Sequence, residues 1–387
     1  MEHTISRRCF LGTAAAITTS GRLLYGQQPS VAPAPPPVTT APVFSPANRR
    51  SVVGLASGES RRKNICESLL AIEDRILPTL ATKKYVVIKP NIVSAEKPLA
   101  STHVDALHGV LDFLGPRFKG SVVIAESSPG FTTEGYENLR YREVVREHKP
   151  LRVSLVDLNE EAKYVTHPIL NSDLHFVPAR LAARLVDPDA FIICSTVMKT
   201  HNTVVATLSI KNMALGAPLH SPRAEKRGWS DKRIFHGGVR QTHVDIALTA
   251  QKLQPFWGVA VIDGFEGMEG NGPIDGTRVP SRIAIASRDF VAADRVGIEA
   301  MGIDASWVGY LGFCAQFGLG QNDLAKIDIR GPKLAGVARK YKMSDSIQRE
   351  LRWMGPMKEV PEKLGCVRPE DGLSPPGLCY LAQMRTG

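Results

Sequence analysis

The feature that most constrains this chain is a repeated alternation of short apolar runs with longer amphipathic segments from Ser51 onward. Runs such as Val86-Val87-Ile88 are continuous and rich in β-branched residues, which is typical of strands covered on both faces. The alternation predicts an α/β fold, with one large domain and a mostly parallel sheet covered by helices on both faces. The predicted strands are 52–56, 85–89, 121–125, 153–157, 190–194, 259–263, 283–287 and 327–330, and the main predicted helices are 65–80, 104–114, 244–253 and 291–301.

The composition is that of an ordinary globular protein. Of the 387 residues, 43% are hydrophobic and 22% are charged, which excludes a disordered or fibrous chain. Apolar runs fall short of the roughly 18 residues that a bilayer span needs, so we expect no integral membrane span in the mature protein. The net charge is +10, but the basic residues are scattered and aromatic residues make up only 6%. We therefore expect no nucleic-acid partner.

The N-terminal segment carries an export motif. Ser6-Arg7-Arg8-Cys9-Phe10-Leu11 places two adjacent arginines before a Phe-Leu pair, and a short, weakly apolar stretch follows at 12–19. Such a pair is an address that the twin-arginine (Tat) export machinery reads. The motif predicts a Tat signal peptide over residues 1–28 and a periplasmic or otherwise exported, secreted protein. The alternative is a chance basic pair at the terminus.

Three further segments complete the predicted organisation. Residues 29–50 form a linker, because seven prolines between Pro29 and Pro46 favour extended geometry over a packed core. The α/β domain covers residues 51–331. Residues 332–387 are a C-terminal extension, in which Cys366 and Cys379 could pair in an oxidising compartment.

Polar side chains follow the predicted strands at the points where the strands end. In open parallel sheets, ligands bind beyond the carboxyl ends of the strands. Lys199 and Lys211 have apolar neighbours in sequence, and together with Lys89 they predict a cationic pocket for a carboxylate or phosphate. The alternative is that each lysine buries its stem and keeps its ammonium group in water. The strand-end motifs are Lys89-Pro90-Asn91, Glu126-Ser127-Ser128, Lys199-Thr200-His201, Asp263-Gly264-Phe265-Glu266 and Asp289.

Four histidines follow along the chain, and their side chains suit a divalent metal or proton transfer. They have no recognised metal-ligand spacing, so a metal, an acid–base role and a purely structural role all remain open. The four are His201, His220, His236 and His243, with Asp245 close behind the last.

A glycine-rich segment from Asp263 to Pro273 has four glycines in eleven residues. Its glycines permit close approach of backbone to a ligand, and Asp263 and Glu269 could orient a cation or act as bases. A tight structural turn is the alternative. The segment is neither a Walker A loop nor a dinucleotide-binding fingerprint.

Cysteine usage argues against a redox cluster within this chain. Cys194 lies in a predicted core strand and is expected to be inert. Since no C-x-x-C-x-x-C motif is present, we expect no self-contained iron–sulfur cluster.

The order of these motifs, across residues 51–331, resembles the family called domain of unknown function 362. The family has no general assigned activity; some members carry an added ferredoxin module, which would imply a redox role, but this sequence lacks its cysteines. The resembling motifs are Val87-Ile88-Lys89-Pro90-Asn91, Lys199-Thr200-His201, Leu208-Ser209-Ile210-Lys211-Asn212-Met213, Ile262-Asp263-Gly264, Met268-Glu269-Gly270-Asn271-Gly272-Pro273 and Val291-Ala292-Ala293-Asp294. The resemblance implies pocket roles for Lys89, Asn91, Lys199, His201, Lys211, Asn212, Asp263, Glu269, Asn271 and Asp294. Because Asp294 lies inside a predicted helix, a capping or pairing role in the structure is the alternative for this residue.

The sequence thus predicts an exported α/β protein that binds or transforms a small anionic molecule in a crevice at the carboxyl ends of its strands. Two alternatives are a non-catalytic periplasmic binding module and a redox-associated protein. The cofactor is unassigned, with a divalent metal as the candidate. The expected catalytic residues are His201, His236, Asp263 and Glu269, and the expected ligand-binding residues are Lys89, Asn91, Lys199, Lys211, Asn212 and Asn271.

Overall fold

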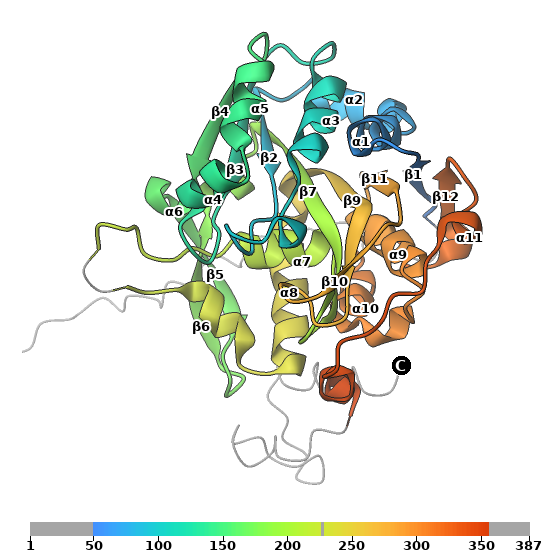
Figure 1. Ribbon diagram of the computed structural model, residues 1–387. Helices are drawn as coiled ribbons and strands as arrows, with labels where there is room; N and C mark the ends of the chain where they lie inside the picture. The colour runs from blue at the N-terminus through green and yellow to red at the C-terminus, as the bar shows by residue number, and fades with distance from the viewer. Residues whose placement is uncertain (1–48, 226–227, 356–387) are drawn as a thin grey trace, which may run out of the picture. The chain divides into compact units, whose positions relative to one another are not determined.

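The computed structural model describes residues 49–225 and 228–355 (Figure 1). The twin-arginine motif, the proline-rich stretch and the cysteine pair expected in the C-terminal extension lie outside these residues. The centre is a ten-stranded sheet of order β12-β1-β11-β9-β7-β2-β3-β4, with β8 beside β7 and β10 beside β9. Its strands are β1 (Ser51–Ser57), β2 (Tyr85–Lys89), β3 (Ser121–Glu126), β4 (Arg152–Asp157), β7 (Ala190–His201), β8 (Val205–Thr207), β9 (Trp257–Glu269), β10 (Thr277–Val279), β11 (Ile283–Ser287) and β12 (Ile327–Arg330).

The sheet is mostly parallel, as predicted. Along the main path only the two pairs that involve β11 are antiparallel, and the other five are parallel. All eight predicted strands are present. Strands β7 and β9 run well beyond their predicted ends, and these extensions carry the short strands β8 and β10.

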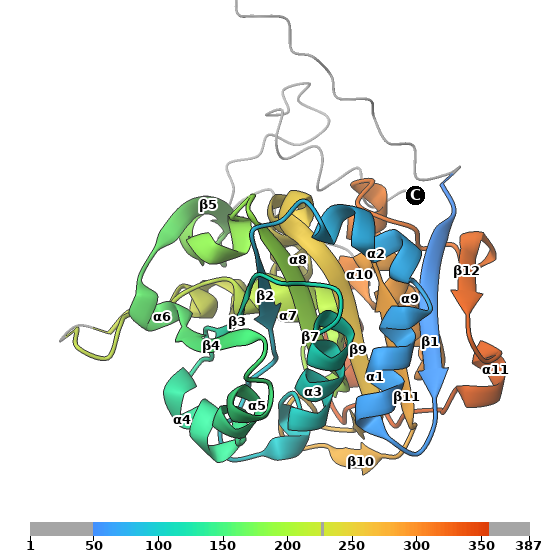
Figure 2. The same ribbon diagram turned by 90° about the horizontal axis from the view of Figure 1, so that it is seen from above.

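Helices cover both faces of the sheet, which confirms the predicted architecture (Figure 2). Side chains along β2 alternate between the faces: Val86 and Ile88 join one apolar core, and Val87 joins the other. The first core packs against α1 (Arg61–Leu70), α2 (Glu73–Leu80), α3 (Val104–Leu114), α4 (Thr132–Asn138) and α5 (Tyr141–Glu147). The second packs against α7 (Ser209–Gly216), α8 (Val239–Leu253), α9 (Phe290–Ala300) and α10 (Gly309–Gln316).

Two features differ from the sequence prediction. The helix expected at 65–80 is two helices, α1 and α2, which separate at Ala71 and Ile72. A separate hairpin of β5 (Tyr164–Leu170) and β6 (Phe176–Ala182) was not expected, because each strand contains a proline and proline usually argues against a strand. In the hairpin, Pro168 lies opposite Pro178.

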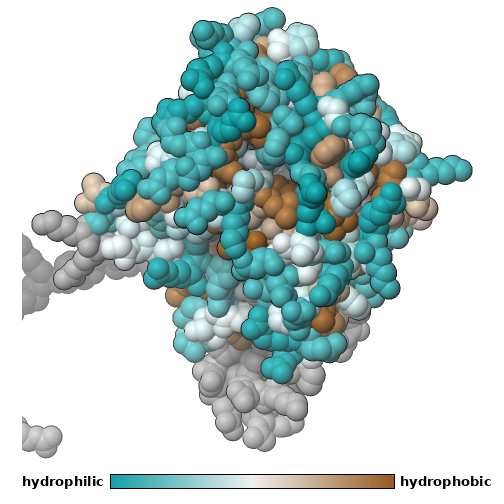
Figure 3. Space-filling view, in the orientation of Figure 1, coloured by the Kyte–Doolittle hydropathy of each residue, from teal (hydrophilic) through white to brown (hydrophobic). Residues whose placement is uncertain are grey.

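The remaining helices are short. The described part of the C-terminal extension lies against the sheet domain: Tyr341 is only 3% exposed, and the indole of Trp353 contacts the His243 ring at a tilt, with the ring centroids 5.2 Å apart. No helix within residues 49–225 and 228–355 is long and apolar enough to cross a membrane. The surface in Figure 3 is mainly hydrophilic, with apolar residues gathered toward the middle of this face. The short helices include α6 (Leu158–Glu161), η4 (Asp231–His236), α11 (Leu334–Val337), α12 (Ile347–Glu350) and η8 (Leu351–Met354).

Candidate functional site

A pocket lies where β2 and β3 end, beside the far end of β7. Its cavity volume is about 190 Å³, which is enough for a small metabolite. Helix α7 and the 3-10 helix η4 complete its wall, so the pocket is at the predicted edge of the sheet. Its lining residues are Lys89, Asn91, Ile92, Val93, Glu126, Ser127, Pro129, His201, Thr207, Lys211, Asn212, Leu215, Gly216, Lys232, His236 and Pro273.

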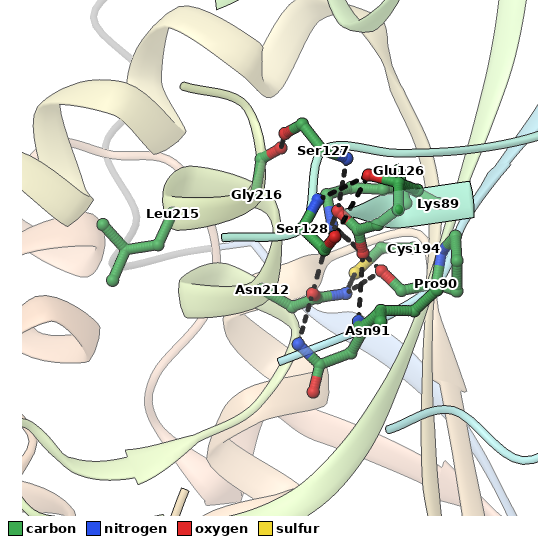
Figure 4. Close-up of polar contacts among 12 residues, drawn as sticks. Lys89, Pro90, Asn91, Glu126, Ser127, Ser128, Cys194, Asn212, Leu215 and Gly216 are labelled. Atoms are coloured by element: carbon green, nitrogen blue, oxygen red, sulfur yellow. Dashed lines mark hydrogen bonds and ion pairs between the residues drawn. The ribbon is translucent and has the colours of Figure 1, made fainter. Parts of the chain in front are cut away.

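A buried ion pair forms one side of the pocket (Figure 4). The Lys89 ammonium lies 3.0 and 3.1 Å from the two carboxylate oxygens of Glu126. It also donates to the Pro90 carbonyl at 2.9 Å and to Asn212 Oδ1 at 3.2 Å. Glu126 accepts a further hydrogen bond from the Ser127 backbone N–H at 2.8 Å. The charge of Glu126 is therefore already matched by Lys89.

Two amide side chains join β2, β7 and α7. Asn91 Nδ2 donates to Asn212 Oδ1 at 3.1 Å. The Lys199 ammonium donates to Asn91 Oδ1 and to the Ala100 carbonyl, both at 2.7 Å. Burial, with the nearby charge of Lys211 adding to it, holds the pKa of Lys199 well below its usual value. Lys199 lies behind Asn91 and fixes the orientation of its amide.

Lys211 and Lys232 bring two more amines to the pocket. Lys232 donates to Ser127 Oγ and to the Leu215 carbonyl, both at 3.0 Å. The Lys211 side chain is 7% exposed, and its ammonium has neither a hydrogen bond nor an ion pair with any residue that the structure describes. Burial lowers the pKa of each amine to about 7; the Lys89 charge also lowers that of Lys211, whereas Glu126 partly offsets the effect at Lys232.

Helix α7 is held in place from behind by Asp294 of α9. Its carboxylate accepts hydrogen bonds from the Ser209 backbone N–H at 2.8 Å, the Ser209 hydroxyl at 2.5 Å and the Ile210 N–H at 3.0 Å. Burial raises the pKa of Asp294 to about 7. Asp294, which the family resemblance placed in the pocket, instead positions the helix that carries Lys211 and Asn212.

The two histidines of the pocket present different ring atoms. His201 Nδ1 accepts the Thr203 backbone N–H at 3.0 Å, so the ring proton is on Nε2. His236 Nδ1 lies 2.9 Å from the Lys232 carbonyl and must donate to it, which leaves Nε2 as the basic atom of the neutral ring. Burial, then the charge of Lys211, lowers the pKa of both rings.

Besides Lys199, three predicted site residues do not line this pocket. Asp263 is paired with Arg61 of α1, with Nε and Oδ2 3.1 Å apart. Glu269 accepts the Lys342 backbone N–H at 2.8 Å, and Asn271 Nδ2 donates to Asp345 at 2.9 Å. Of the glycine-rich segment, only Pro273 lines the pocket.

The other two histidines singled out in the sequence, His220 and His243, do not line the pocket. His243 is buried with Nδ1 accepting the Tyr310 backbone N–H, and burial lowers its pKa to about 3. His220 lies near the carbonyls of Ser221 and Ser128. Within the described ranges, no three His, Cys, Asp or Glu side chains are grouped to hold a metal ion.

Among the three cysteines that the structure describes, Cys194 is the one that contacts the polar network. It is buried in β7, as expected, and its thiol accepts a hydrogen bond from Asn212 Nδ2 at 3.3 Å. Burial raises the pKa of this thiol to about 12, so it stays protonated and unreactive at neutral pH.

Sequence reasoning did not assign Glu126, Ser127 and Lys232 to the site. Glu126 and Ser127 belong to a strand-end motif that the sequence shows. Because a buried Lys89 needs an acidic partner, Glu126 could have been recognised as that partner. Lys232 lies in the polar stretch Ser-Asp-Lys-Arg, which gives no sign of burial.

Comparison with known proteins gives a family but no activity. No curated protein matches this chain. A crystal structure of a protein from Thermotoga maritima, from the Northeast Structural Genomics Consortium, matches with 9% identity and a TM-score of 0.37. The match covers 66% of this chain and 59% of that one, so this chain spans less than two thirds of the matched protein. The model of the family described as "Domain of unknown function (DUF362)" matches residues 86–299, more than half of the sequence, and the chain therefore belongs to this family.

Proposed function

We propose that this protein binds a small carboxylate or phosphate in the pocket and acts on it there. The observation that carries the proposal is the excess of buried amines in the pocket wall: Lys211 and Lys232 have no carboxylate partner among the described residues. Glu126, the one described carboxylate that lines the pocket, is paired with Lys89. A buried ammonium without a counter-ion costs several kcal/mol, and a bound anion would supply the missing charge.

The histidines favour a reaction over simple capture. His201 offers an N–H donor and His236 offers a basic nitrogen, and both rings line the same pocket. A donor and an acceptor beside an anion-binding group suit proton transfer on the bound molecule. If the protein is instead a non-catalytic binding module, His236→Gln will keep anion affinity and there will be no turnover for the substitution to remove.

Thermal unfolding with added anions tests the proposed binding. Sulfate, phosphate and acetate are added separately, and the one that binds should raise the Tm, by the equivalent of about 2.7 kcal/mol at 100 times its Kd. Lys211→Ala and Lys232→Ala should each reduce this rise. Lys63→Ala, which removes an amine that is 74% exposed, is the matched control. No stabilisation by any anion, or equal loss in the control, would refute the proposal.

We further propose that the protein is exported by the twin-arginine route. The support is the motif Arg7-Arg8 followed by Phe10-Leu11. Changing Arg7 and Arg8 together to lysine keeps the charge and removes the arginine pair. The full chain should then accumulate in the cytoplasm and disappear from the periplasmic fraction. An unchanged distribution would contradict export by this route.

A further inference from the structure

We propose that Lys211 is a nucleophile that forms an imine with the carbonyl carbon of the ligand, and that the ligand is a small oxo acid. This inference rests on the proposed anion binding and narrows it to one class: a carboxylate next to an aldehyde or ketone.

The geometry selects Lys211 among the four buried lysines. Imine formation needs an amine lone pair that is free to reach a carbonyl carbon. Lys89 is held by Glu126 and two further acceptors, and Lys232 by two acceptors. Lys199 is likewise held by two acceptors and does not line the pocket. Lys211 lines the pocket and has no hydrogen-bond acceptor within the described part of the chain.

The surroundings of Lys211 favour its neutral form. The side chain is buried in α7, and the charge of Lys89, whose position is fixed by its ion pair, acts on it. A desolvated lysine beside a second cation is an arrangement that produces a nucleophilic amine near neutral pH. The pKa of Lys211, lowered to about 7, agrees with this geometry.

The pocket also holds groups that suit the rest of an oxo acid. The Lys232 ammonium is a cation for the carboxylate, and the His201 Nε2–H is a donor for the carbonyl oxygen. In the step, the Lys211 lone pair forms the C–N bond while the carbonyl π electrons move to oxygen. The nitrogen loses a proton, the oxygen gains two from the amine and solvent and leaves as water, and the product is the protonated imine. No oxidant or reductant is needed.

Reductive trapping tests the proposal. Full-length protein is treated with glyoxylate and cyanoborohydride at pH 6.5, and modified lysines are identified by peptide mass spectrometry. At this pH the neutral share of Lys211 should exceed that of an exposed lysine roughly a thousandfold. We therefore expect Lys211 to be modified long before Lys63, and acetate to slow the reaction. Lys211→Arg should remove the label, with circular dichroism and Tm confirming that the variant folds.

The alternative outcomes separate the imine from anion binding. If calorimetry shows that glyoxylate binds but Lys211 reacts no faster than Lys63, the imine is refuted and anion binding stands. If label appears on Lys232 instead, the assignment to Lys211 is refuted. If acetaldehyde, which has no carboxylate, labels Lys211 as selectively as glyoxylate and acetate gives no protection, the oxo-acid class is refuted. Without glyoxylate binding or labelling, the oxo-acid and imine proposals fail, whereas anion binding fails only if sulfate, phosphate and acetate also leave the Tm unchanged.

Discussion

The pocket and the glycine-rich segment 263–273 both lie where strands of the same sheet were predicted to end, and both looked like binding sites in sequence. In the pocket, Lys211 faces a cavity without a partner among the described residues. In the glycine-rich segment, the protein itself supplies the partners: Arg61 pairs with Asp263, and the backbone N–H of Lys342 is bonded to Glu269. Polar residues at strand ends therefore indicate a ligand site only where the fold leaves their charge uncompensated.

The glycines of the two regions teach the same lesson. A Cβ at Gly216 would lie 2.1 Å from the Lys89 Nζ, so this glycine makes room for the pocket's ion pair. A Cβ at Gly267 would lie 2.0 Å from the Tyr341 hydroxyl, and one at Gly272 would lie 2.0 Å from the Thr200 carbonyl oxygen. In both regions the approaching group belongs to the protein, but only at Gly216 is it a residue that lines the pocket.

The largest effect should come from Glu126→Gln. The substitution leaves the Lys89 ammonium, which is 0% exposed, without its carboxylate. Removing one partner of a buried pair costs about 3–5 kcal/mol. We expect the free energy of unfolding in denaturant titrations to fall by this amount. Glu67→Gln, which disrupts the exposed pair with Lys63, is the control and should change it little. Equal stability of the Glu126 variant and the wild type would show that the pair contributes nothing.

The second prediction compares two glycines directly. Gly216→Ala and Gly267→Ala should each cost about 1–3 kcal/mol, because each methyl group overpacks a buried site. Only Gly216→Ala should also weaken anion binding, since its methyl group displaces Lys89. Chemical denaturation gives the first quantity and calorimetric titration the second. Gly130→Ala is the control for both, because a Cβ there meets nothing within 4 Å. Loss of anion affinity in the Gly267 variant would contradict the claim that only the pocket takes part in anion binding.

Much of the difference between the pocket and the glycine-rich segment could not be predicted from the sequence. Continuous runs such as Val86-Val87-Ile88 identify buried strands, so the sheet and the edge that carries Lys89 could be predicted. The partner of Asp263 could not be: Arg61 is 202 positions away in sequence, on α1, and no local pattern links the two. Lys232 was missed for the same reason, because its burial is set by contacts with Ser127 and Leu215.

The third prediction concerns pH. Lys211 and Lys232 have pKa values lowered to about 7, so both lose positive charge as the pH rises through 7. If the proposed anion binding holds, sulfate affinity should fall severalfold between pH 6 and pH 8.5. Stability without anion should change in the opposite direction, since the unfolded chain binds more protons than the folded one above pH 7. Calorimetry at several pH values measures the affinity, and sulfate keeps its charge throughout.

Asp263→Asn is the control for this pH dependence. It removes the carboxylate that pairs with Arg61, and it lies outside the pocket. The variant should keep the decline in sulfate affinity, whatever stability it loses. A flat profile in the wild type would mean that these two lysines do not hold the anion.

The smallest effect should come from Asn271→Ala. Asn271 is exposed, and its hydrogen bonds run to Asp345 at the surface, with one long contact of 3.4 Å from the Ser344 hydroxyl. We therefore expect a change in unfolding free energy within about 0.5 kcal/mol and unchanged anion affinity. Asn212→Ala is the matched substitution in the pocket, where the amide bonds Lys89, Asn91 and the Pro90 carbonyl. It leaves buried donors without acceptors and should cost more stability and reduce affinity. If calorimetry instead finds weaker anion binding in the Asn271 variant, the segment contributes to the site after all, by a route other than direct contact with the pocket.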